Sequence, residues 1–413
     1  MRTAQPSRAP PAARPDPTHP ARLDAEEAHR VSQNRPAAVI VLAAGEGTRM
    51  RSATPKVLHA IGGRTLLGHA MTAARSLDPD HLVVVVRHGR DRVAPHVVEV
   101  DPKALVADQD EIKGTGRAVR CGLNVLPPGL TGTVVVTYGD VPLLSGATLG
   151  DLLVAHTASG AAATVLTATV DDPTGYGRVI RADDGTVLGI VEHKDADEGQ
   201  RAVREINSGI YAFDAEVLAS ALARVGTDNV QGEVYLTDVL GIARADGLTV
   251  SARCTDDVWQ VEGVNDRAQL AALGAELNRR VLRRAMVAGV TVRDPGTTWV
   301  DVQVDLEPDV TLLPGVQLLG RTRVRGGATV GPDTTLVDSE VGAGATVVRT
   351  QAVRAVIGDG VVVGPFAHLR PGTVLRAAEG ADPPVPWPAG DRPATGSPAG
   401  GYADVTDEGA TRS

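Results

Sequence analysis

The chain has 413 residues and a formal net charge of −9; 43% of its residues are hydrophobic, 22% are charged and only 2% are aromatic. This is the composition of a globular protein with room for two domains. The negative balance argues against a nucleic-acid-binding surface, which needs clustered Lys and Arg. No apolar run approaches the roughly 18 residues that cross a bilayer. Because aromatic residues are so few, the core must consist of Ala, Val, Leu and Ile, which favours parallel strands covered by helices.

The two cysteines and the N-terminal segment exclude further classes. Cys121 and Cys254 show neither a CxxC spacing nor a Cys/His cluster, so we expect reduced thiols and neither a disulfide framework nor a structural zinc site. Residues 1–35 are rich in Pro, Ala and Arg and contain no apolar segment of signal-peptide type. The sequence therefore predicts a disordered extension there.

From residue 37 the pattern alternates apolar strands with helical segments. This alternation predicts an α/β fold, a Rossmann-like, doubly wound and mostly parallel sheet. We expect strands at 39–43, 82–86, 105–106, 134–138, 162–170 and 206–213, a hairpin around 183–185, a helix through 66–77 and a long helix over about 266–286.

After Val290 apolar residues recur every six positions, a period that fits neither a helix nor an isolated strand. It is typical of hexapeptide repeats, in which each side of a triangular, left-handed parallel β-helix contributes one inward aliphatic residue. The run supports roughly four turns. The expected inward residues are Val304, Val310, Val316, Leu318, Val324, Val330, Leu336, Val341, Val347, Val353, Ile357, Val363, Leu369 and Leu375.

These patterns divide the chain into five parts. We expect a nucleotidyltransferase domain at 36–265, a linking helix at 266–290 and a short β-helix at 291–375, between disordered segments at 1–35 and 376–413, the latter rich in Pro, Ala and Gly.

The strongest chemical signal is the glycine-rich string 42–50, Leu-Ala-Ala-Gly-Glu-Gly-Thr-Arg-Met, with Pro55-Lys56 shortly after it. The string directly follows a predicted buried strand. Its small residues let the backbone approach a nucleotide, and successive N–H groups can form an anion-binding nest. Arg49 and Lys56 supply the cations that a triphosphate needs. The spacing matches neither a dinucleotide-binding loop nor a P-loop.

This string resembles the signature of sugar-nucleotide pyrophosphorylases. Over about residues 37–375 the chain resembles the bifunctional N-acetylglucosamine-1-phosphate uridyltransferase and glucosamine-1-phosphate acetyltransferase family, with a shortened acetyltransferase region. The resemblance implies that the string Tyr138-Gly139-Asp140-Val141-Pro142 carries a Mg²⁺-binding aspartate. It also implies a UTP site that contains Leu42, Ala43, Ala44, Gly45, Lys56, Gln109, Gly114 and Thr115.

Four further strings, at 172–178, 191–195, 205–209 and 261–265, match the sugar side of that family and its second metal ligand. By this likeness Asn265 joins Asp140 on the metal. A carboxylate at the end of a strand, paired with a neutral oxygen donor, can indeed hold Mg²⁺ against phosphates. The implied contacts to N-acetylglucosamine 1-phosphate are Tyr138, Gly139, Gly177, Glu192, Asn207 and Asn265.

Simpler roles stay open for several of these residues. Asp140 can cap the turn that follows it, Glu192 can be a solvated charge, and both Asn207 and Asn265 can satisfy turn backbones. His193 is interpreted as structural.

Two strings near the expected site are also ambiguous. The string 231–238 resembles the family but can be local scaffold. Ile112-Lys113 departs from the usual uracil loop, which bears on the stringency for uridine.

The string 364–372 matches the start of the family's acetyltransferase region, and Arg370 resembles one of its substrate-binding arginines. The later coils, which carry the family's catalytic histidine, have no counterpart before Ser413. We therefore expect acetyltransferase activity to be absent.

The sequence thus predicts a Mg²⁺-dependent uridylyltransferase that makes UDP-N-acetylglucosamine and pyrophosphate from UTP and N-acetylglucosamine 1-phosphate. Arg49, Lys56 and Asp140 are its expected catalytic residues. The resemblance implies a cytoplasmic enzyme that feeds cell-wall and peptidoglycan synthesis, with a possible homotrimer through the β-helix and no nucleic-acid or membrane partner. Two rivals remain: a pyrophosphorylase for another nucleotide and sugar phosphate, and a non-catalytic assembly or regulatory subunit.

Overall fold

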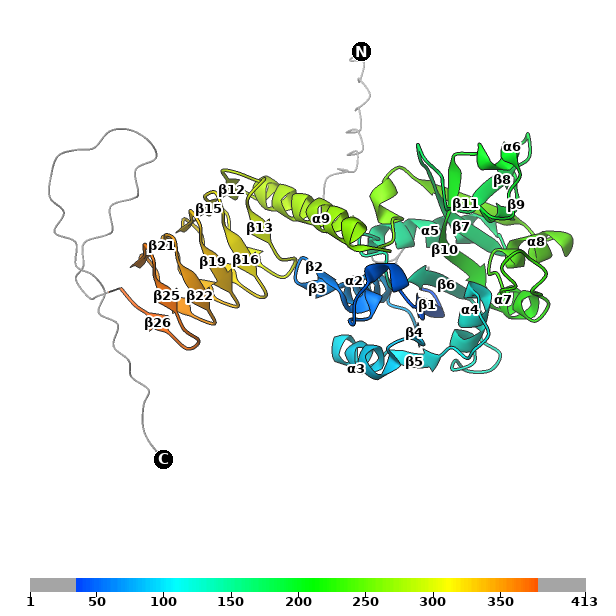
Figure 1. The fold of residues 1–413 in the computed structure, drawn as a ribbon, viewed down its shortest axis with the longest axis horizontal. Coiled ribbons are helices and arrows are strands. Elements are labelled where there is room, and N and C mark those ends of the chain that lie inside the picture. Colours follow the sequence, from blue (N-terminus) through cyan, green and yellow to red (C-terminus); the bar gives the residue numbers. More distant parts are fainter. Residues whose placement is uncertain (1–34, 378–413) are drawn as a thin grey trace, which may run out of the picture.

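The computed structural model describes residues 35–377. The two segments expected to be disordered were 1–35 and 376–413. Apart from residues 35, 376 and 377, they lie outside the described residues. An α/β domain is followed by a long helix and then by a row of short stacked strands (Figure 1).

The α/β domain is built on a nine-stranded sheet with the order β11-β7-β10-β6-β1-β4-β5, and the hairpin β8–β9 extends from β10. Only β10 and the hairpin run antiparallel to their neighbours, so the expected mixed, mostly parallel sheet is confirmed. The strands are β1 (Ala38–Ala43), β4 (His81–Val86), β5 (Leu105–Asp108), β6 (Thr133–Tyr138), β7 (Ala163–Thr169), β8 (Arg178–Arg181), β9 (Val187–Val191), β10 (Glu205–Asp214) and β11 (Val250–Thr255).

Helices cover both faces of this sheet. Strand β1 is buried along its whole length, as expected for a central parallel strand with apolar residues on both sides. One core cluster joins the sheet to α4, α7 and α8, and the other joins it to α2, α3 and α5. The helices are α2 (Leu66–Arg75), α3 (Arg90–Val100), α4 (Thr115–Leu123), α5 (Gly146–Ser159), α6 (Glu198–Arg201), α7 (Ala215–Leu222), α8 (Asp238–Ala245) and α9 (Arg267–Val287), with 3-10 turns η1 (Thr48–Met50), η2 (Lys56–Leu58) and η3 (Val258–Gln260).

The C-terminal part is a left-handed parallel β-helix made of three parallel five-stranded sheets. Its interior is a single column of small aliphatic side chains. The strands are β12 (Thr291–Val292), β13 (Trp299–Val300), β14 (Asp305–Leu306), β15 (Thr311–Leu312), β16 (Gln317–Leu319), β17 (Arg323–Val324), β18 (Thr329–Val330), β19 (Thr335–Val337), β20 (Glu340–Val341), β21 (Thr346–Val347), β22 (Gln351–Val353), β23 (Val356–Ile357), β24 (Val362–Val363), β25 (His368–Leu369) and β26 (Val374–Leu375).

Two details of the predicted repeat are wrong. Each face holds five strands, so there are five coils and not four. The number of coils came out too low because Val292 and Val300, inward residues of the first coil, are eight positions apart, which breaks the six-residue period. Ala352, not Val353, points inward, since it stacks on Leu336 from a coil shorter than the usual three hexapeptides.

Helix α9 and a small hairpin join the two parts. The hairpin consists of β2 (Ala60–Ile61) and β3 (Arg64–Thr65). Its Gly62 carbonyl accepts a hydrogen bond of 3.0 Å from the N–H of Val302, in the first coil. Asn278 of α9 donates to the Thr298 carbonyl at 2.8 Å and accepts from the Val300 N–H at 3.0 Å. The first coil is therefore hydrogen-bonded to the domain that precedes it.

Within residues 35–377, no helix is long and apolar enough to cross a membrane.

The column of aliphatic side chains should hold the β-helix together. Leu336 is fully buried, so Leu336→Ala should lower the free energy of unfolding of this part by about 2–5 kcal/mol, through lost contacts and the cavity left behind. Val362→Ala is the control, since its side chain is 50% exposed. Denaturant unfolding of both variants gives the comparison, and equal losses would contradict a packed interior.

Candidate functional site

The glycine-rich string begins where β1 ends, at the carboxyl edge of the sheet. Leu42 and Ala43 are the last two residues of the strand, and Ala44 and Gly45 follow them. At this edge Gly139, directly after β6, donates its N–H to the Leu42 carbonyl at 2.9 Å. The sheet thus brings the expected phosphate segment beside the expected metal segment, as the parallel order of β1 and β6 requires.

Gly47 lets the backbone of this segment pass close to Lys56. Its φ is 65°, and an added Cβ would lie 2.7 Å from the Cβ of Lys56. The Lys56 side chain, only 12% exposed, forms an ion pair with the carboxylate of Asp140, which is 17% exposed. Arg49 lies on the exposed side of the same segment. The Lys56 ammonium is therefore paired with the carboxylate of Asp140, the residue predicted from the sequence to bind the metal.

Asn265 reaches the same edge from the loop that precedes α9. Within that loop the N–H of Val264 donates to the Asp140 carbonyl at 2.9 Å, and a Cβ on Gly263 would lie 3.8 Å from the Asp140 carboxylate. The Asn265 N–H is fixed by the side chain of Gln269 at 2.8 Å. The two proposed metal ligands are therefore carried by loops that are hydrogen-bonded to each other.

The chemistry of these donors fits a small divalent cation. Among the residues that the structure describes, no group of three or more His, Cys, Asp or Glu side chains is arranged to hold a metal. The pair instead offers one carboxylate and one amide. Mg²⁺ prefers such oxygen ligands and usually completes its shell with substrate phosphates and water.

The expected uracil loop packs against the string 231–238. Gly114 has φ 116°, and a Cβ there would lie 2.2 Å from the Val234 carbonyl oxygen. The Thr115 hydroxyl accepts from the Leu236 N–H at 3.1 Å. Gln109 donates to the carbonyl of Ile112 at 3.0 Å. The backbone carbonyls of Ile112 and Lys113 accept the hydrogen bonds from Gln109 and Val234. The shape of the loop therefore depends on its backbone rather than on the side chains of these two residues.

The residues expected to contact the sugar also come together. Asn207 donates its backbone N–H to the Gly177 carbonyl at 2.9 Å. A Cβ on Gly177 would lie 3.4 Å from a carboxylate oxygen of Glu192 and 3.5 Å from the Cβ of Asn207. The Asn207 side-chain oxygen accepts from the Tyr211 hydroxyl at 2.8 Å. The same oxygen also accepts from the Gly209 N–H at 2.8 Å, so Asn207 does satisfy a turn backbone, and the Tyr211 hydroxyl further orients its side chain.

Burial perturbs two acidic groups here. It raises the pKa of Glu192, against a weak hydrogen bond from Thr237 at 3.5 Å, and nearby Asp195 and Asp238 raise it further. Burial also raises the pKa of the Tyr138 hydroxyl, with smaller contributions from Asp140 and Glu192. Perturbed groups of this kind gather at functional sites.

Sequence reasoning missed part of this arrangement. The string 231–238 supplies Val234 and Leu236 to the uracil loop and Thr237 to Glu192, so it supports both sides of the candidate site. Its resemblance to the family was the available signal. Gly209 was also missed: a Cβ on it would lie 2.4 Å from the Tyr138 ring.

Two further residues, His193 and Arg370, differ in where the structure places them. His193 accepts a hydrogen bond from Arg178 at 3.3 Å, which fits its structural interpretation. Arg370 is exposed and lies between β25 and β26, at the end of the β-helix away from the α/β domain (Figure 1). The structure does not bring it to the sheet edge.

The glycine-rich segment and the Lys56–Asp140 pair lie at the carboxyl edge of the sheet, and a β-helix follows the domain. This combination is that of a nucleotidyltransferase with a hexapeptide-repeat domain. Residues 39–208 match the MobA-like NTP transferase domain family. The chain is 65% identical over 343 residues to the Bifunctional protein GlmU of Kineococcus radiotolerans, covering 83% of this chain and 70% of the relative. It is 59% identical over 354 residues to that of Micrococcus luteus, covering 83% and 71%. The chain belongs to the GlmU family.

The uracil loop should tolerate no side chain at Gly114. A Cβ at position 114 would clash with the Val234 backbone and displace the loop. UTP binding, measured by isothermal titration calorimetry, should therefore weaken by about 10-fold or more. Gly129→Ala is the matched control because Gly129 also has positive φ, 73°, but nothing lies within 4 Å of an added Cβ. Equal affinities for the two variants would contradict the role of this loop.

Glu192 should lower stability at neutral pH. Since its folded pKa is raised, the folded state holds the proton more tightly than the unfolded state, and stability falls as pH rises from 4.5 through the folded pKa. Glu192→Gln removes this penalty, so it should raise Tm at pH 8 more than at pH 4, measured by scanning calorimetry.

Glu205→Gln is the control with the opposite sign. Burial raises the pKa of Glu205, but hydrogen bonds from Arg181 and Thr167 outweigh it and leave the pKa lowered. The charged form therefore stabilises the fold above pH 4.5, and the substitution should lower Tm at pH 8. Equal shifts in the two variants would refute the assigned environments.

Proposed function

We propose that this protein transfers a uridylyl group from UTP to N-acetylglucosamine 1-phosphate and releases pyrophosphate. The observation that carries the proposal is the meeting of Asp140, Lys56 and the loop of Asn265 at the carboxyl edge of the sheet. Membership of the GlmU family and the match to NTP transferase domains support it.

The reaction needs alignment and charge neutralisation more than proton transfer. An anionic phosphate oxygen of the sugar phosphate attacks the α-phosphorus of UTP. The new P–O bond forms as the bond from the α-phosphorus to the oxygen bridging to the β-phosphorus breaks, and pyrophosphate leaves with that electron pair. Arg49 and Lys56 neutralise the triphosphate and the charge that develops on the leaving group.

We further propose Mg²⁺ as the cofactor, held by Asp140 and Asn265. A bound Mg²⁺ supplies Lewis-acid stabilisation of phosphate oxygens and orients them for in-line attack. An ion held by Asp140 would take the place of the Lys56 ammonium, which pairs with this carboxylate in the free protein. Lys56 then becomes available to the phosphates, so one side chain serves both the substrate-free and the loaded site.

Selectivity is proposed to come from the two neighbouring surfaces. The loop with Gln109, Gly114 and Thr115 reads the uracil edge, while Tyr138, Gly139, Gly177, Glu192, Asn207 and Asn265 receive the sugar phosphate. The support is their clustering around the same edge. A buried site that hydrogen-bonds a substrate rejects analogues that leave its polar groups unpaired.

The predicted absence of acetyl transfer, with Arg370 as its remnant, stays a prediction. So do the homotrimer through the β-helix, the cytoplasmic location and the supply of cell-wall synthesis.

A direct assay separates the proposal from its rivals. Purified protein is supplied with UTP, Mg²⁺ and N-acetylglucosamine 1-phosphate, and pyrophosphate release is followed; a parallel assay follows thiol release from acetyl-CoA with glucosamine 1-phosphate. Pyrophosphate without thiol is the expected result. Faster turnover of another nucleotide and sugar phosphate would favour the rival pyrophosphorylase, and no turnover of any pair would favour the assembly subunit.

Asp140 should be indispensable to the reaction. Asp140→Asn keeps the shape but removes the charge, so kcat should fall by about 10²-fold or more while circular dichroism stays that of the native fold. Asp151→Asn is the control because Asp151 lies on α5 with its side chain 68% exposed. An Asp140→Asn variant that keeps its rate would rule out the metal assignment.

A further inference from the structure

Two loops must keep a fixed spacing for Asp140 and Asn265 to share one ion. We propose that Gln260, Asp257 and Arg280 are positioning residues that set this spacing from helix α9. The inference rests on the proposed function and names residues that touch neither substrate nor metal.

Gln260 connects the segment that follows Asp140 to the segment that precedes Asn265. It precedes Asn265 by five positions, and its partner Ser145 follows Asp140 by five. The Gln260 side-chain oxygen accepts from the Ser145 N–H at 3.0 Å and from the Thr148 hydroxyl at 2.6 Å. Ser145 is also the N-cap of α5, so the connection ends on a fixed point of the fold.

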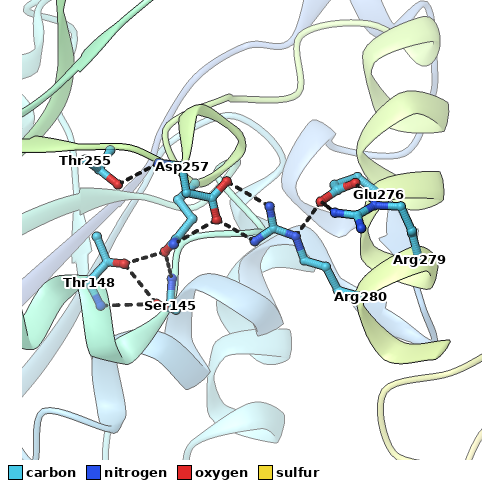
Figure 2. A network of polar contacts seen from close by, with 8 residues as sticks. Ser145, Thr148, Thr255, Asp257, Glu276, Arg279 and Arg280 are labelled. Atoms are coloured by element: carbon cyan, nitrogen blue, oxygen red, sulfur yellow. Dashed lines mark hydrogen bonds and ion pairs between the residues drawn. The ribbon is translucent and has the colours of Figure 1, made fainter. Parts of the chain in front are cut away.

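The other end of Gln260 is held by a carboxylate. Its amide nitrogen donates to Asp257 Oδ2 at 3.1 Å. Both oxygens of Asp257 also accept from Arg280, each at 2.8 Å, in a bidentate pair (Figure 2). Such fork-to-fork pairing fixes direction as well as distance. The turn η3, which leads into the Asn265 loop, is thereby anchored to α9.

Arg280 is itself oriented by a neighbouring charge. Its Nε donates to Glu276 Oε1 at 2.6 Å, and the Glu276 side chain is only 7% exposed. Arg279 pairs with the same carboxylate, at 2.6 and 2.7 Å, but is 62% exposed (Figure 2). Both hydrogen bonds of the Arg279 side chain within the described residues go to Glu276, and none goes to Asp257. The two adjacent arginines thus differ in the contact with Asp257, which only Arg280 makes.

The anchor extends to the β-helix. Asn278, two positions before Arg280, makes the hydrogen bonds to Thr298 and Val300 that hold the first coil. Helix α9 therefore carries both connections within one turn. Removing a group that hydrogen-bonds a metal ligand directly commonly changes metal affinity by about 10–100-fold. Gln260, Asp257 and Arg280 act through the loops and not on the ligands themselves, so their removal should have a smaller effect.

Metal affinity is the readout that a merely structural role would not move. Mn²⁺ replaces Mg²⁺, and its dissociation constant is measured by electron paramagnetic resonance in the presence of UTP. Arg280→Ala and Gln260→Leu should each weaken Mn²⁺ binding by about threefold to 10-fold, at or below the lower end of the range for direct partners of metal ligands. Arg280→Lys keeps the charge but loses the bidentate pair. Its dissociation constant for Mn²⁺ should lie between that of the parent protein and those of the two other variants. Arg279→Ala should stay within about twofold, as it removes only an exposed pair.

Two results would overturn the inference. One is Mn²⁺ affinity unchanged in folded Gln260→Leu and Arg280→Ala proteins. The other is a loss in Arg279→Ala as large as that in Arg280→Ala. If one variant does not fold, Arg280→Lys and the remaining variant still decide.

The proposed function is tested separately by turnover of the parent protein. Parent protein that binds Mn²⁺ through this network yet makes no UDP-N-acetylglucosamine would sink the proposed function and leave the positioning role standing.

Discussion

One backbone hydrogen bond organises the candidate site: the N–H of Val264 donates to the carbonyl of Asp140. It joins the end of the central strand β6 to the loop that leads into α9, two segments far apart in the sequence. Val264 is completely buried in an apolar cluster with Met50, next to the glycine-rich segment, so the bond is shielded from water. The bond holds the Asn265 loop beside Asp140, which the parallel strands β1 and β6 in turn place beside the glycine-rich segment.

Charge and backbone shape at this edge are arranged for a ligand at some cost to stability. Glu192 is buried in a setting that disfavours its charge, and Gly114 adopts a conformation that L side chains rarely take. Lys56 covers Asp140 in the free protein, which spares the edge an unpaired, largely buried carboxylate. Polar groups held ready in this way need little rearrangement when charged substrates arrive. The interior of the β-helix, by contrast, is mostly aliphatic and carries no buried charge among the described residues.

The sequence predicted what periodicity and short motifs can encode. Apolar strands gave the mostly parallel sheet, and the six-residue repeat gave the β-helix. The inward position of Ala352 escaped because a shortened coil moves the register without changing residue type. The partners of Gln260 and Arg280 escaped for another reason: Ser145 is 115 residues from Gln260, and Asp257 is 23 from Arg280, so no local pattern announces the contacts. The string 231–238 could be recognised in the sequence, but its contacts with Gly114 and Glu192 became apparent only in the structure.

The proposed site depends most on one exchange at Asp140, in which a divalent metal ion replaces the Lys56 ammonium. A crystal structure with UTP and Mn²⁺, located by anomalous scattering, tests it directly. Oxygens of Asp140 and Asn265 should be the protein ligands of Mn²⁺, and the Lys56 ammonium should lie against the phosphates. Mn²⁺ bound elsewhere, with the Lys56–Asp140 pair intact beside bound UTP, would contradict it.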